Sequence, residues 1–368
     1  MLTANETKAA LAANGPLGQM STFDHENVVF CNDNVTGLKA IIAIHNTVLG
    51  PALGGTRMWP YATEAEALTD ALRLSRGMSY KAAVAGLNLG GGKAVIIGDS
   101  RTQKTEGMMR RFGKFVNILN GKYITAEDVG IGTKDMEHVF METKHVTGIP
   151  PALGGSGDPS PVTAYGVYVS MKASAKERWG NDSLAGKKVG VQGVGHVGAA
   201  LVDYLMKEGA KVTITDIYED KIAEVIKLHP TVEVVAGDKF LDLDMDIYAP
   251  CALGATVNND SLSRLKCSII CGAANNQLAD ENVHGKIVME KGIIYAPDYV
   301  VNAGGLINVY SEVAKYGRDN AMAQTENIYH TTAAIFALAK KENIPTFMAA
   351  NRTAEARIAA IAHLRTKR

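Results

Sequence analysis

Two lysines stand where charge is unexpected, and they are the residues best suited to do chemistry. Lys81 follows a run of helix formers that ends near Tyr80, and Lys93 follows three glycines and opens the apolar run 94–97. A lysine held in an apolar neighbourhood near a second cation loses proton affinity and can act as a base near neutral pH. The three glycines indicate a close approach to the backbone. A surface lysine after a flexible loop explains the same segment equally well.

Asp128 is the acid that could work with Lys93. It comes directly after the buried-looking run 123–126, in the segment TAEDVG. In α/β folds the ends of strands face the ligand crevice, so this carboxylate could exchange protons with Lys93. A turn or N-cap aspartate is an equally good interpretation of the local sequence.

A glycine-rich turn carries a second kind of chemistry. Gly193, Gly195 and Gly198 have the spacing G-x-G-x-x-G, with the apolar run 188–192 before them and a helical segment after them. In a dinucleotide-binding turn these glycines permit a tight bend, close approach of the pyrophosphate and close helix packing. The helix N-terminus adds amide donors for the phosphates. A glycine turn in a nonbinding α/β domain is the alternative, which the register of strand, turn and helix disfavours.

Asp216 ends the next predicted strand, 211–215. A carboxylate there can accept hydrogen bonds from ribose hydroxyls and repels a 2′-phosphate. No arginine follows in the next four residues. The sequence therefore favours NAD over NADP.

The elements that must position these residues fall into two α/β regions. In the first, Thr63 begins a capping-box pattern before a helix that reaches about residue 80. The other elements predicted there are strands 26–30, 38–45, 93–97 and 123–126 and a helix over 108–119. The stretch 148–159 is rich in Gly and Pro and is the predicted linker, after which Ser160 is the expected N-cap.

The second region alternates short β-branched runs with helical segments, which predicts a parallel sheet covered by helices. Its strand candidates are 188–192, 211–215, 232–235, 245–249, 268–271 and 293–296. After Asn302 the pattern is helical to the end of the chain. The fold class is thus α/β, with an N-terminal α/β domain over 1–148 and a Rossmann-type, doubly wound domain over 149–334.

Composition excludes several function classes. Lys plus Arg (38) equals Asp plus Glu (38), so the charge supports neither nucleic-acid binding nor attachment to a membrane surface. No run approaches the ~18 apolar residues of a membrane span, and the first 15 residues lack the pattern of a signal peptide. The four cysteines lack zinc-site spacing, and Cys267 and Cys271 are expected in the core. We expect a cytoplasmic protein without a metal.

Long segments of the chain resemble the glutamate/leucine/phenylalanine/valine dehydrogenase family, and most closely its leucine-type members. The resemblance covers most of the chain, in the family's order. It is carried by GPALGGTRMW (50–59), GMSYKAAVAGLNLGGGK (77–93), YITAEDVG (123–130), DPSPVTAYGV (158–167), VQGVGHVG (191–198), DIYAPCALGATVN (246–258), AANNQL (273–278) and YAPDYVVNAGG (295–305).

By this resemblance, Lys93 is the catalytic base that activates water, Asp128 exchanges protons with the amino group, and Lys81 binds the substrate carboxylate. The other implied substrate contacts are Leu53, Gly54, Met78, Ala126, Thr147, Leu306 and Val309. The implied cofactor contacts are Gly193, Val194, Gly195, His196, Val197, Gly198, Asp216, Ala249, Asn275 and Asn302. The resemblance also implies that the C-terminal segment 335–368 returns to the first domain, with a ligand cleft between the domains.

The implied activity is reversible NAD-dependent oxidative deamination of leucine and other branched-chain amino acids to 2-oxo acids and ammonia. Glutamate-specific relatives have a lysine at Leu53 and a serine at Val309 to hold a distal carboxylate. Ala126 looks like the leucine-type residue, whereas Leu306 resembles phenylalanine enzymes. Core packing alone would also account for Leu53, Leu306 and Val309.

Alternatives from other classes remain. Phenylalanine or valine is a possible substrate within the family, and a noncatalytic NAD-binding protein would keep the fold without the chemistry. A 2-hydroxy-acid dehydrogenase would need a His–acid pair, whereas His45 and His145 are interpreted as packing or surface residues. The family resemblance further implies a homo-oligomer, often an octamer.

Overall fold

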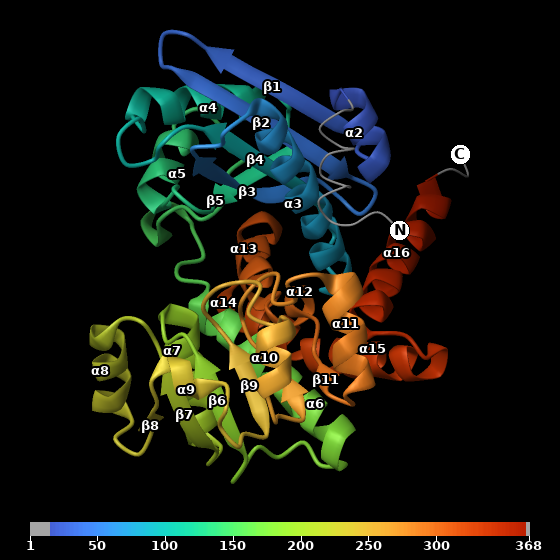
Figure 1. The fold of residues 1–368 in the computed structure, drawn as a ribbon. Helices are drawn as coiled ribbons and strands as arrows, with labels where there is room; N and C mark the ends of the chain where they lie inside the picture. Colours follow the sequence, from blue (N-terminus) through green and yellow to red (C-terminus); the bar gives the residue numbers. More distant parts are fainter. Residues whose placement is uncertain (1–14, 366–368) are drawn as a thin grey trace. The chain divides into compact units, whose positions relative to one another are not determined.

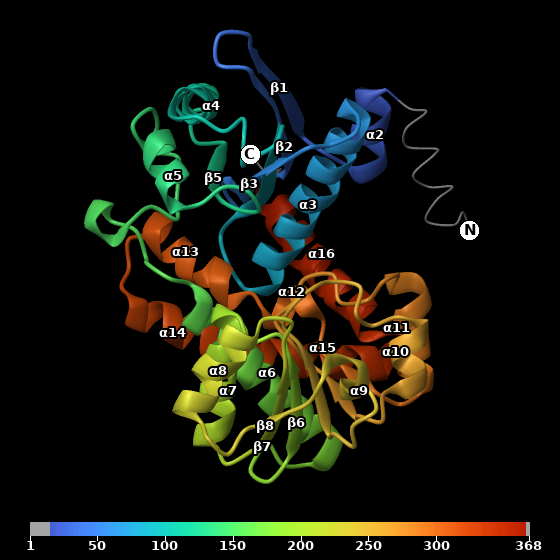
Figure 2. The same ribbon diagram turned by 60° about the vertical axis from the view of Figure 1, so that its left-hand side comes forward.

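The computed structural model describes residues 15–365, and it forms two compact units (Figures 1 and 2). The first unit comprises the chain up to Gly157, Glu312–Lys315 and the segment from Ala354; the second comprises Asp158–Ser311 and Tyr316–Thr353. The sequence analysis placed the division at 148/149 and the returning segment at about 335. The absence of a signal peptide was expected from the first 15 residues, of which 1–14 lie outside the described residues.

The first unit contains a five-stranded mixed sheet with the order β1-β2-β4-β3-β5. The two antiparallel pairs are β1/β2 and β2/β4, whereas β3 runs parallel to both β4 and β5. The strands are β1 (Asn27–Asp33), β2 (Leu38–Asn46), β3 (Ala52–Trp59), β4 (Gly90–Ile97) and β5 (Tyr123–Glu127). The helices are α2 (Pro16–Phe23), α3 (Glu64–Val84), α4 (Glu106–Ile118) and α5 (Thr133–Phe140).

Alternating side chains of β2 build two cores, one on each face of this sheet, as the two-residue period of a strand requires. Ile41 and Ala43 pack with Leu68 and Leu72 of α3. The alternate set, which includes Ile42, packs with α4 and α5. The sheet is therefore buried on both faces, and α3 lies along one of them (Figure 1).

Several sequence predictions for this unit are confirmed and others are wrong. Thr63 does cap α3, since its hydroxyl accepts a hydrogen bond from Glu66 N at 3.1 Å. The predicted end of this helix near residue 80 is wrong: α3 continues to Val84, so Lys81 lies in its last turn and not after it. Strand β3 was not predicted, because its two glycines and the preceding proline are poor strand formers.

The second unit contains a six-stranded parallel sheet with the order β11-β10-β9-β6-β7-β8. Numbered from β6, this is the 3-2-1-4-5-6 order of a dinucleotide-binding fold, whose ligand site lies where the order reverses. The predicted α/β fold class is confirmed. The strands are β6 (Lys188–Gln192), β7 (Lys211–Thr215), β8 (Glu233–Val234), β9 (Ile247–Pro250), β10 (Ile269–Ile270) and β11 (Ile294–Tyr295).

Helices cover both faces of the parallel sheet. The hydrophobic core on one face of the sheet includes residues of α6, α7 and α15, and the core on the other face includes residues of α10 and α11. The helical elements from residue 151 onward are the 3-10 turn η1 (Pro151–Leu153), α6 (Ser160–Trp179), α7 (His196–Lys207), α8 (Glu219–Leu228), α9 (Gly237–Phe240), α10 (Asn259–Arg264), α11 (Glu281–Glu290), α12 (Asp298–Val301), α13 (Gly304–Ala314), α14 (Arg318–Glu326), α15 (Ile328–Glu342) and α16 (Thr346–Arg365). The N-cap of α6 is Pro159 and not Ser160, which is already helical.

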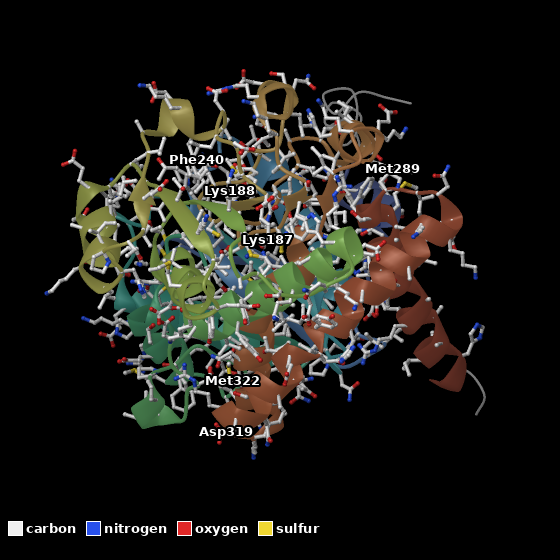
Figure 3. All side chains as sticks on the ribbon, turned by 90° about the horizontal axis from the view of Figure 1, so that it is seen from below. Lys187, Lys188, Phe240, Met289, Asp319 and Met322 are labelled. Carbon is white, nitrogen blue, oxygen red and sulfur yellow. The ribbon has the colours of Figure 1, made fainter. Side chains whose placement is uncertain are left out.

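The amino ends of these strands lie away from the ligand edge that the strand order predicts. Figure 3 views the side of the molecule on which Lys187 and Lys188 lie, where β6 begins. Phe240, also labelled there, is fully buried in one core of the sheet.

Among residues 15–365, no helix is long and apolar enough to span a membrane.

Two histidines of the first unit are held close together beside α3. The Nε2 atom of His25 lies 2.8 Å from Ser75 Oγ, and Nδ1 of His45 lies 2.7 Å from Ser79 Oγ. Their rings meet edge to face with centroids 4.8 Å apart. Burial lowers the pKa of His25 to about 4 and that of His45 to about 3. His45 was expected to be a packing or surface residue, and its burial shows that it is a packing residue.

These histidines should make the fold sensitive to acid. Between pH 6.5 and about 4 the unfolded chain binds protons at both rings and the folded chain does not, so stability falls as the pH falls through this window. The loss from His45 alone is on the order of 3 kcal/mol at pH 4. Urea unfolding from pH 7 to pH 4 should show a weaker pH dependence in the double variant His25→Gln/His45→Gln. A slope equal to that of wild type, or an equal effect of His330→Gln on the surface, would contradict this.

Candidate active site

The three glycines before Lys93 make room for the protein's own elements. A Cβ on Gly91 would lie 2.1 Å from Ser79 N and 2.3 Å from Ser75 O, both backbone atoms of α3. A Cβ on Gly92 would lie 2.6 Å from the ring of Tyr123. The close approach predicted from the sequence is thus helix-to-strand packing, which sets α3, with Lys81 in its last turn, directly against the strand that carries Lys93.

Lys93 is buried and paired, which the sequence could not decide. It lies within β4, its exposed fraction is 6%, and its Nζ donates a hydrogen bond to Asp128 Oδ2 at 2.5 Å. Burial lowers the pKa of Lys93 below its ordinary value, against the opposing pull of the Asp128 charge. A lysine in this state gives up its proton more readily than a surface lysine, as a general base requires.

Asp128 follows β5 and is held by two cations. Its Oδ2 accepts hydrogen bonds from Lys93 Nζ and, at 3.1 Å, from Nε of Arg57. Burial alone would raise the pKa of this carboxyl, but the Lys93 and Arg57 charges outweigh burial and hold its pKa below the ordinary value. The turn is closed by Ile131 N, which donates to Asp128 O at 2.9 Å. The structure thus brings Asp128 and Lys93 together, and the exchange of protons between them stays a prediction.

Three residues of this network were missed by the sequence analysis. Arg57 of β3 also donates from NH1 to Asp70 Oδ2 of α3 at 3.0 Å. The hydroxyl of Tyr61 donates to the same oxygen at 2.6 Å. The only available signal was that Arg57 lies in the family motif GPALGGTRMW; neither Asp70 nor Tyr61 belongs to a quoted motif.

The substrate residues predicted in the first unit lie on two strands of its sheet, on the segment beside that sheet that contains Thr147, and on helix α3. Leu53, with an exposed fraction of 2%, and Gly54 are in β3, and Ala126 is in the adjacent strand β5. Thr147 is joined to the same edge, because its backbone N donates to Thr125 O at 2.8 Å. Lys81 and, three residues earlier, Met78 lie on α3. Their direct contact with a substrate stays a prediction.

Gly54 must be glycine because the neighbouring strand leaves no room for a side chain. A Cβ there would lie 1.7 Å from the carbonyl oxygen of Gly92. The Gly54 carbonyl accepts a hydrogen bond from the Tyr123 hydroxyl at 2.6 Å, another contact that the sequence analysis missed. Gly54 therefore lets β3 and β4 lie close together at the point where Leu53 is placed.

The remaining two predicted substrate residues belong to the second unit. Leu306 is buried and Val309 half-buried, both on α13. Whether they share a pocket with Leu53 stays a prediction.

The glycine turn of the second unit has the geometry of a dinucleotide-binding loop. Gly193 has φ +96°, and a Cβ there would lie 2.6 Å from Ala252 Cβ. Gly195 is the N-cap of α7, and a Cβ on it would meet no described atom within 4 Å. A Cβ on Gly198 would lie 2.0 Å from Gly193 O. The space beside the first and third glycines is thus occupied by other atoms of the protein. The space beside the second glycine is open and lies at a helix N-terminus.

The carboxylate of Asp216 is held in place by hydrogen bonds from the glycine turn and from the segment after β7. Its Oδ2 accepts a hydrogen bond from Val194 N at 2.7 Å, and Oδ1 accepts one from Tyr218 N at 3.0 Å. Each oxygen keeps a further lone pair. The carboxylate therefore lies against the glycine turn, with capacity left for hydroxyl donors. His196 and Val197 begin α7 immediately after the turn.

Two asparagines form a hydrogen-bonded pair on the other side of the point where the strand order reverses. Asn275 follows β10, and Asn302 follows β11 and α12. Asn302 Nδ2 donates to Asn275 Oδ1 at 2.7 Å and to Ala273 O at 3.0 Å. Asn302 Oδ1 is buried and has no hydrogen-bond partner among the described residues. Ala249 lies fully buried in β9, between them and the glycine turn in the strand order.

These features fit a bound nicotinamide dinucleotide. The open N-terminus of α7 suits the pyrophosphate, Asp216 suits a ribose diol, and the unsatisfied oxygen of Asn302 suits an amide donor such as a carboxamide. Among the described residues no cluster of His, Cys, Asp or Glu could hold a metal ion. Cys267 and Cys271 are buried and unpaired, so their predicted place in the core is confirmed.

Comparison with known proteins identifies relatives over nearly the whole chain. Residues 25–145 match the family model described as Glu/Leu/Phe/Val dehydrogenase, dimerisation domain. Residues 154–219 and 213–365 match the model described as Glutamate/Leucine/Phenylalanine/Valine dehydrogenase. Lys81, Lys93 and Asp128 fall within the first match, and the glycine turn within the second.

Individual relatives are similar in sequence and in fold. The chain is 56% identical to leucine dehydrogenase of Thermoactinomyces intermedius over 92% of both chains. It is 52% identical to valine dehydrogenase of Streptomyces virginiae, over 91% of this chain and 94% of the relative. The crystal structure of L-tryptophan dehydrogenase from Nostoc punctiforme superposes with a TM-score of 0.84 and 45% identity, over 94% of this chain and 99% of that one.

Proposed function

The chain belongs to the Glu/Leu/Phe/Val dehydrogenase family, and from this we propose that it catalyses the reversible NAD-dependent oxidative deamination of L-leucine and other branched-chain L-amino acids. The products are the 2-oxo acid and ammonia. The observation that carries the proposal is the buried Lys93 amine hydrogen-bonded to Asp128 inside the matched N-terminal region. Curated relatives more than 50% identical include leucine and valine dehydrogenases.

In this mechanism, Lys81 in the last turn of α3 holds the substrate carboxylate and fixes the orientation of the Cα–H bond. NAD, when held by the glycine turn and Asp216, would supply the hydride acceptor for Cα, so that the substrate would be left as an iminium. Neutral Lys93 then removes a proton from a water molecule as the oxygen adds to the iminium carbon, which gives a carbinolamine. Asp128 relays the proton that Lys93 took from water to the amino group. As the C–N bond breaks, the carbinolamine hydroxyl gives its proton to Lys93, and ammonia and the 2-oxo acid are released.

The ionic state of the pair suits this sequence of steps. Lys93 must be neutral to accept the proton of water, and its burial favours the neutral form. Asp128 must be ionised to relay protons. The charges of Lys93 and Arg57 favour its ionised form, and Arg57 continues to do so when Lys93 is neutral. Deamination should therefore rise with pH as Lys93 loses its proton.

The buried Leu53 supports an aliphatic substrate. Glutamate would bring a distal carboxylate to a position where an apolar side chain replaces the lysine of glutamate-specific relatives, and an unpaired buried carboxylate is strongly disfavoured. Valine and phenylalanine are harder to separate from leucine, because one methylene is worth only about 1–3 kcal/mol of discrimination. The valine dehydrogenases among the relatives keep that alternative open.

A substrate panel tests the proposal directly. We expect the absorbance of reduced nicotinamide to rise at alkaline pH with NAD and leucine, isoleucine or valine, and not with glutamate. Production of ammonia in equal amount shows that the reaction is deamination. The proposal is overturned if none of leucine, isoleucine, valine or phenylalanine gives reduced nucleotide.

The preference for NAD is expected to depend on the charge of Asp216. Asp216→Asn keeps an oxygen that can accept from Val194 N and removes the charge that repels a 2′-phosphate, so kcat/KM with NADP should rise by roughly tenfold. Initial rates with each nucleotide at saturating leucine measure the change. Asp220→Asn, on an exposed acid at the start of α8, is the control that should leave the NAD/NADP ratio unchanged. No gain with NADP in Asp216→Asn would remove this role.

We also propose a homo-oligomer, with an octamer as the specific expectation, and a cytoplasmic location. The matched N-terminal model is that of a dimerisation domain. The four cysteines, all described, form no disulfide, which suits a reducing compartment. Light scattering coupled to gel filtration measures the stoichiometry.

A further inference from the structure

Asp128 is tied to a second carboxylate through Arg57. The guanidinium of Arg57 donates from Nε to Asp128 and from NH1 to Asp70, so one planar group bridges acids from two different elements. Tyr61 holds the far side of the bridge, since its hydroxyl donates to the Asp70 oxygen that Arg57 contacts. The side chains of Arg57, Asp70 and Asp128 are each only 23–25% exposed, so solvent screens these charges incompletely.

The bridge orients the acid of the proposed reaction. Lys93 and Arg57 contact the same oxygen, Oδ2, of Asp128. Rotation of the carboxylate would break both contacts at once, because arginine offers its donors in a fixed fork. Arg57 therefore restrains the carboxylate while Lys93 gives up or regains its proton, a step in which the hydrogen bond between Lys93 and Asp128 necessarily changes.

The bridge also places opposite charges near Lys93. The charged groups that act on it are Asp128 after β5, Arg57 of β3 and Asp70 of α3. Arg57 disfavours the protonated amine, whereas Asp70 favours it. Lys81 lies on the same helix as Asp70 and is the amine proposed to hold substrate. Two phenols also adjoin this network, Tyr61 and Tyr123, and burial raises the pKa of each, so they stay neutral in the working range.

We propose that Arg57 and Asp70 are positioning residues that set, in opposite directions, the pH at which the Lys93–Asp128 pair becomes competent for deamination. The inference rests on the proposed function, because it assigns these residues to the proton transfers of that reaction. Neither residue touches the reacting atoms in this scheme; both act through Asp128 and Lys93.

The pH dependence of kcat/KM for leucine separates this role from a merely structural one. In Arg57→Met, Lys93 loses an opposing positive charge, so the rising limb should move to higher pH. In Asp70→Asn, Lys93 loses a favourable negative charge, so the same limb should move to lower pH. Each displacement should be on the order of half a pH unit or more. A structural defect would lower the rate without moving the limb in opposite directions.

A conservative variant distinguishes charge from geometry. Arg57→Lys keeps the charge but cannot bridge both acids with a planar fork, so the limb should stay near its wild-type position while kcat falls. The matched control is Arg110→Met, which breaks the Arg110–Glu142 pair elsewhere in the first unit and should leave the limb in place. Coincident limbs in wild type, Arg57→Met and Asp70→Asn, or displacements in the same direction, would overturn the proposal.

Chemical labelling without nucleotide or amino acid keeps the inference testable apart from catalysis. Acetic anhydride acetylates only neutral amines, and peptide mass spectrometry compares Lys93 with the exposed Lys114. The labelling midpoint of Lys93 should move up in Arg57→Met and down in Asp70→Asn. Opposite shifts in a protein without turnover would overturn the proposed function, and with it the link to deamination, while leaving the opposing effects of Arg57 and Asp70 on Lys93 in place. Labelling that rises at one common pH in all variants, or at no pH, would overturn the inference whatever the turnover.

Discussion

Lys93→Ala is expected to lower kcat for leucine deamination by about 10³-fold or more while leaving the affinity for reduced nucleotide within about twofold. General acid–base groups contribute roughly 10²–10⁴-fold, and Lys93 is the buried amine paired with an ionised acid in this site. The loss should appear in kcat, because Lys93 is proposed to act after the substrate is bound. Stopped assays measure kcat, and NADH fluorescence titration without amino acid measures nucleotide affinity.

The fold should survive this change because Asp128 keeps its bond to Arg57 and is not left as a lone buried charge. Lys93→Met, which retains most of the side-chain volume, controls for the space that alanine leaves and should lose as much activity. Lys114→Ala, on an exposed side chain of α4, should leave kcat unchanged. A Lys93 variant that folds and keeps more than about a tenth of wild-type kcat would remove this residue from the role of base.

Much of the second unit could be predicted from its sequence because local and tertiary preferences agree there. Strands 188–192 and 211–215 have the predicted bounds, since β-branched residues lie between polar or glycine breaks. Predicted strands 268–271 and 293–296 are each reduced to two paired residues. A buried run is apolar along its whole length. A strand, however, extends only as far as its backbone is hydrogen-bonded to the neighbouring strands, which the run itself does not specify.

The first unit was less predictable because its neighbours override local preference. Strand β3 contains Gly54 and Gly55 and follows a proline, yet it is held on both sides by β4 and β5. Helix α3 passes residue 80 because residues 81–85 contain neither glycine nor proline and the next glycine is Gly86. Both elements carry residues of the proposed site, so the errors in the fold lie close to the chemistry.

The candidate site shows the same division. Asp128 could be inferred from the end of a strand. Lys93 could be inferred from its position after three glycines, although the strand predicted to begin at residue 93 begins at Gly90, which places Lys93 within β4. The contacts of Arg57 with Asp70 and Asp128 span 13 and 71 residues of sequence, and each acid has an ordinary surface interpretation. The packing of α3 on the sheet, where Gly91 leaves room for the helix, brings Asp70 beside Arg57.

Gly198→Ala is expected to abolish tight nucleotide binding and to destabilise the protein, whereas Gly195→Ala should weaken binding alone. A Cβ on Gly198 would lie 2.0 Å from the Gly193 carbonyl oxygen, a backbone atom that cannot rotate away. Helix α7 or the turn must therefore shift, at a cost of about 1–3 kcal/mol. At Gly195 the Cβ meets no described atom within 4 Å, so the added methyl obstructs only a bound pyrophosphate.

The contrast between these two glycines tests the turn as a built phosphate site and not merely a tight bend. NADH titration should show at least a tenfold loss of affinity in both variants. The thermal unfolding temperature should fall only in Gly198→Ala. Gly77→Ala, at an exposed helical position of α3 with nothing described within 4 Å, is the control and should unfold at the same or a higher temperature. If Gly195→Ala bound nucleotide as wild type does, the open N-terminus of α7 would not be where the phosphates lie. If Gly198→Ala were as stable as wild type, the close contact between turn and helix would not hold the loop in shape.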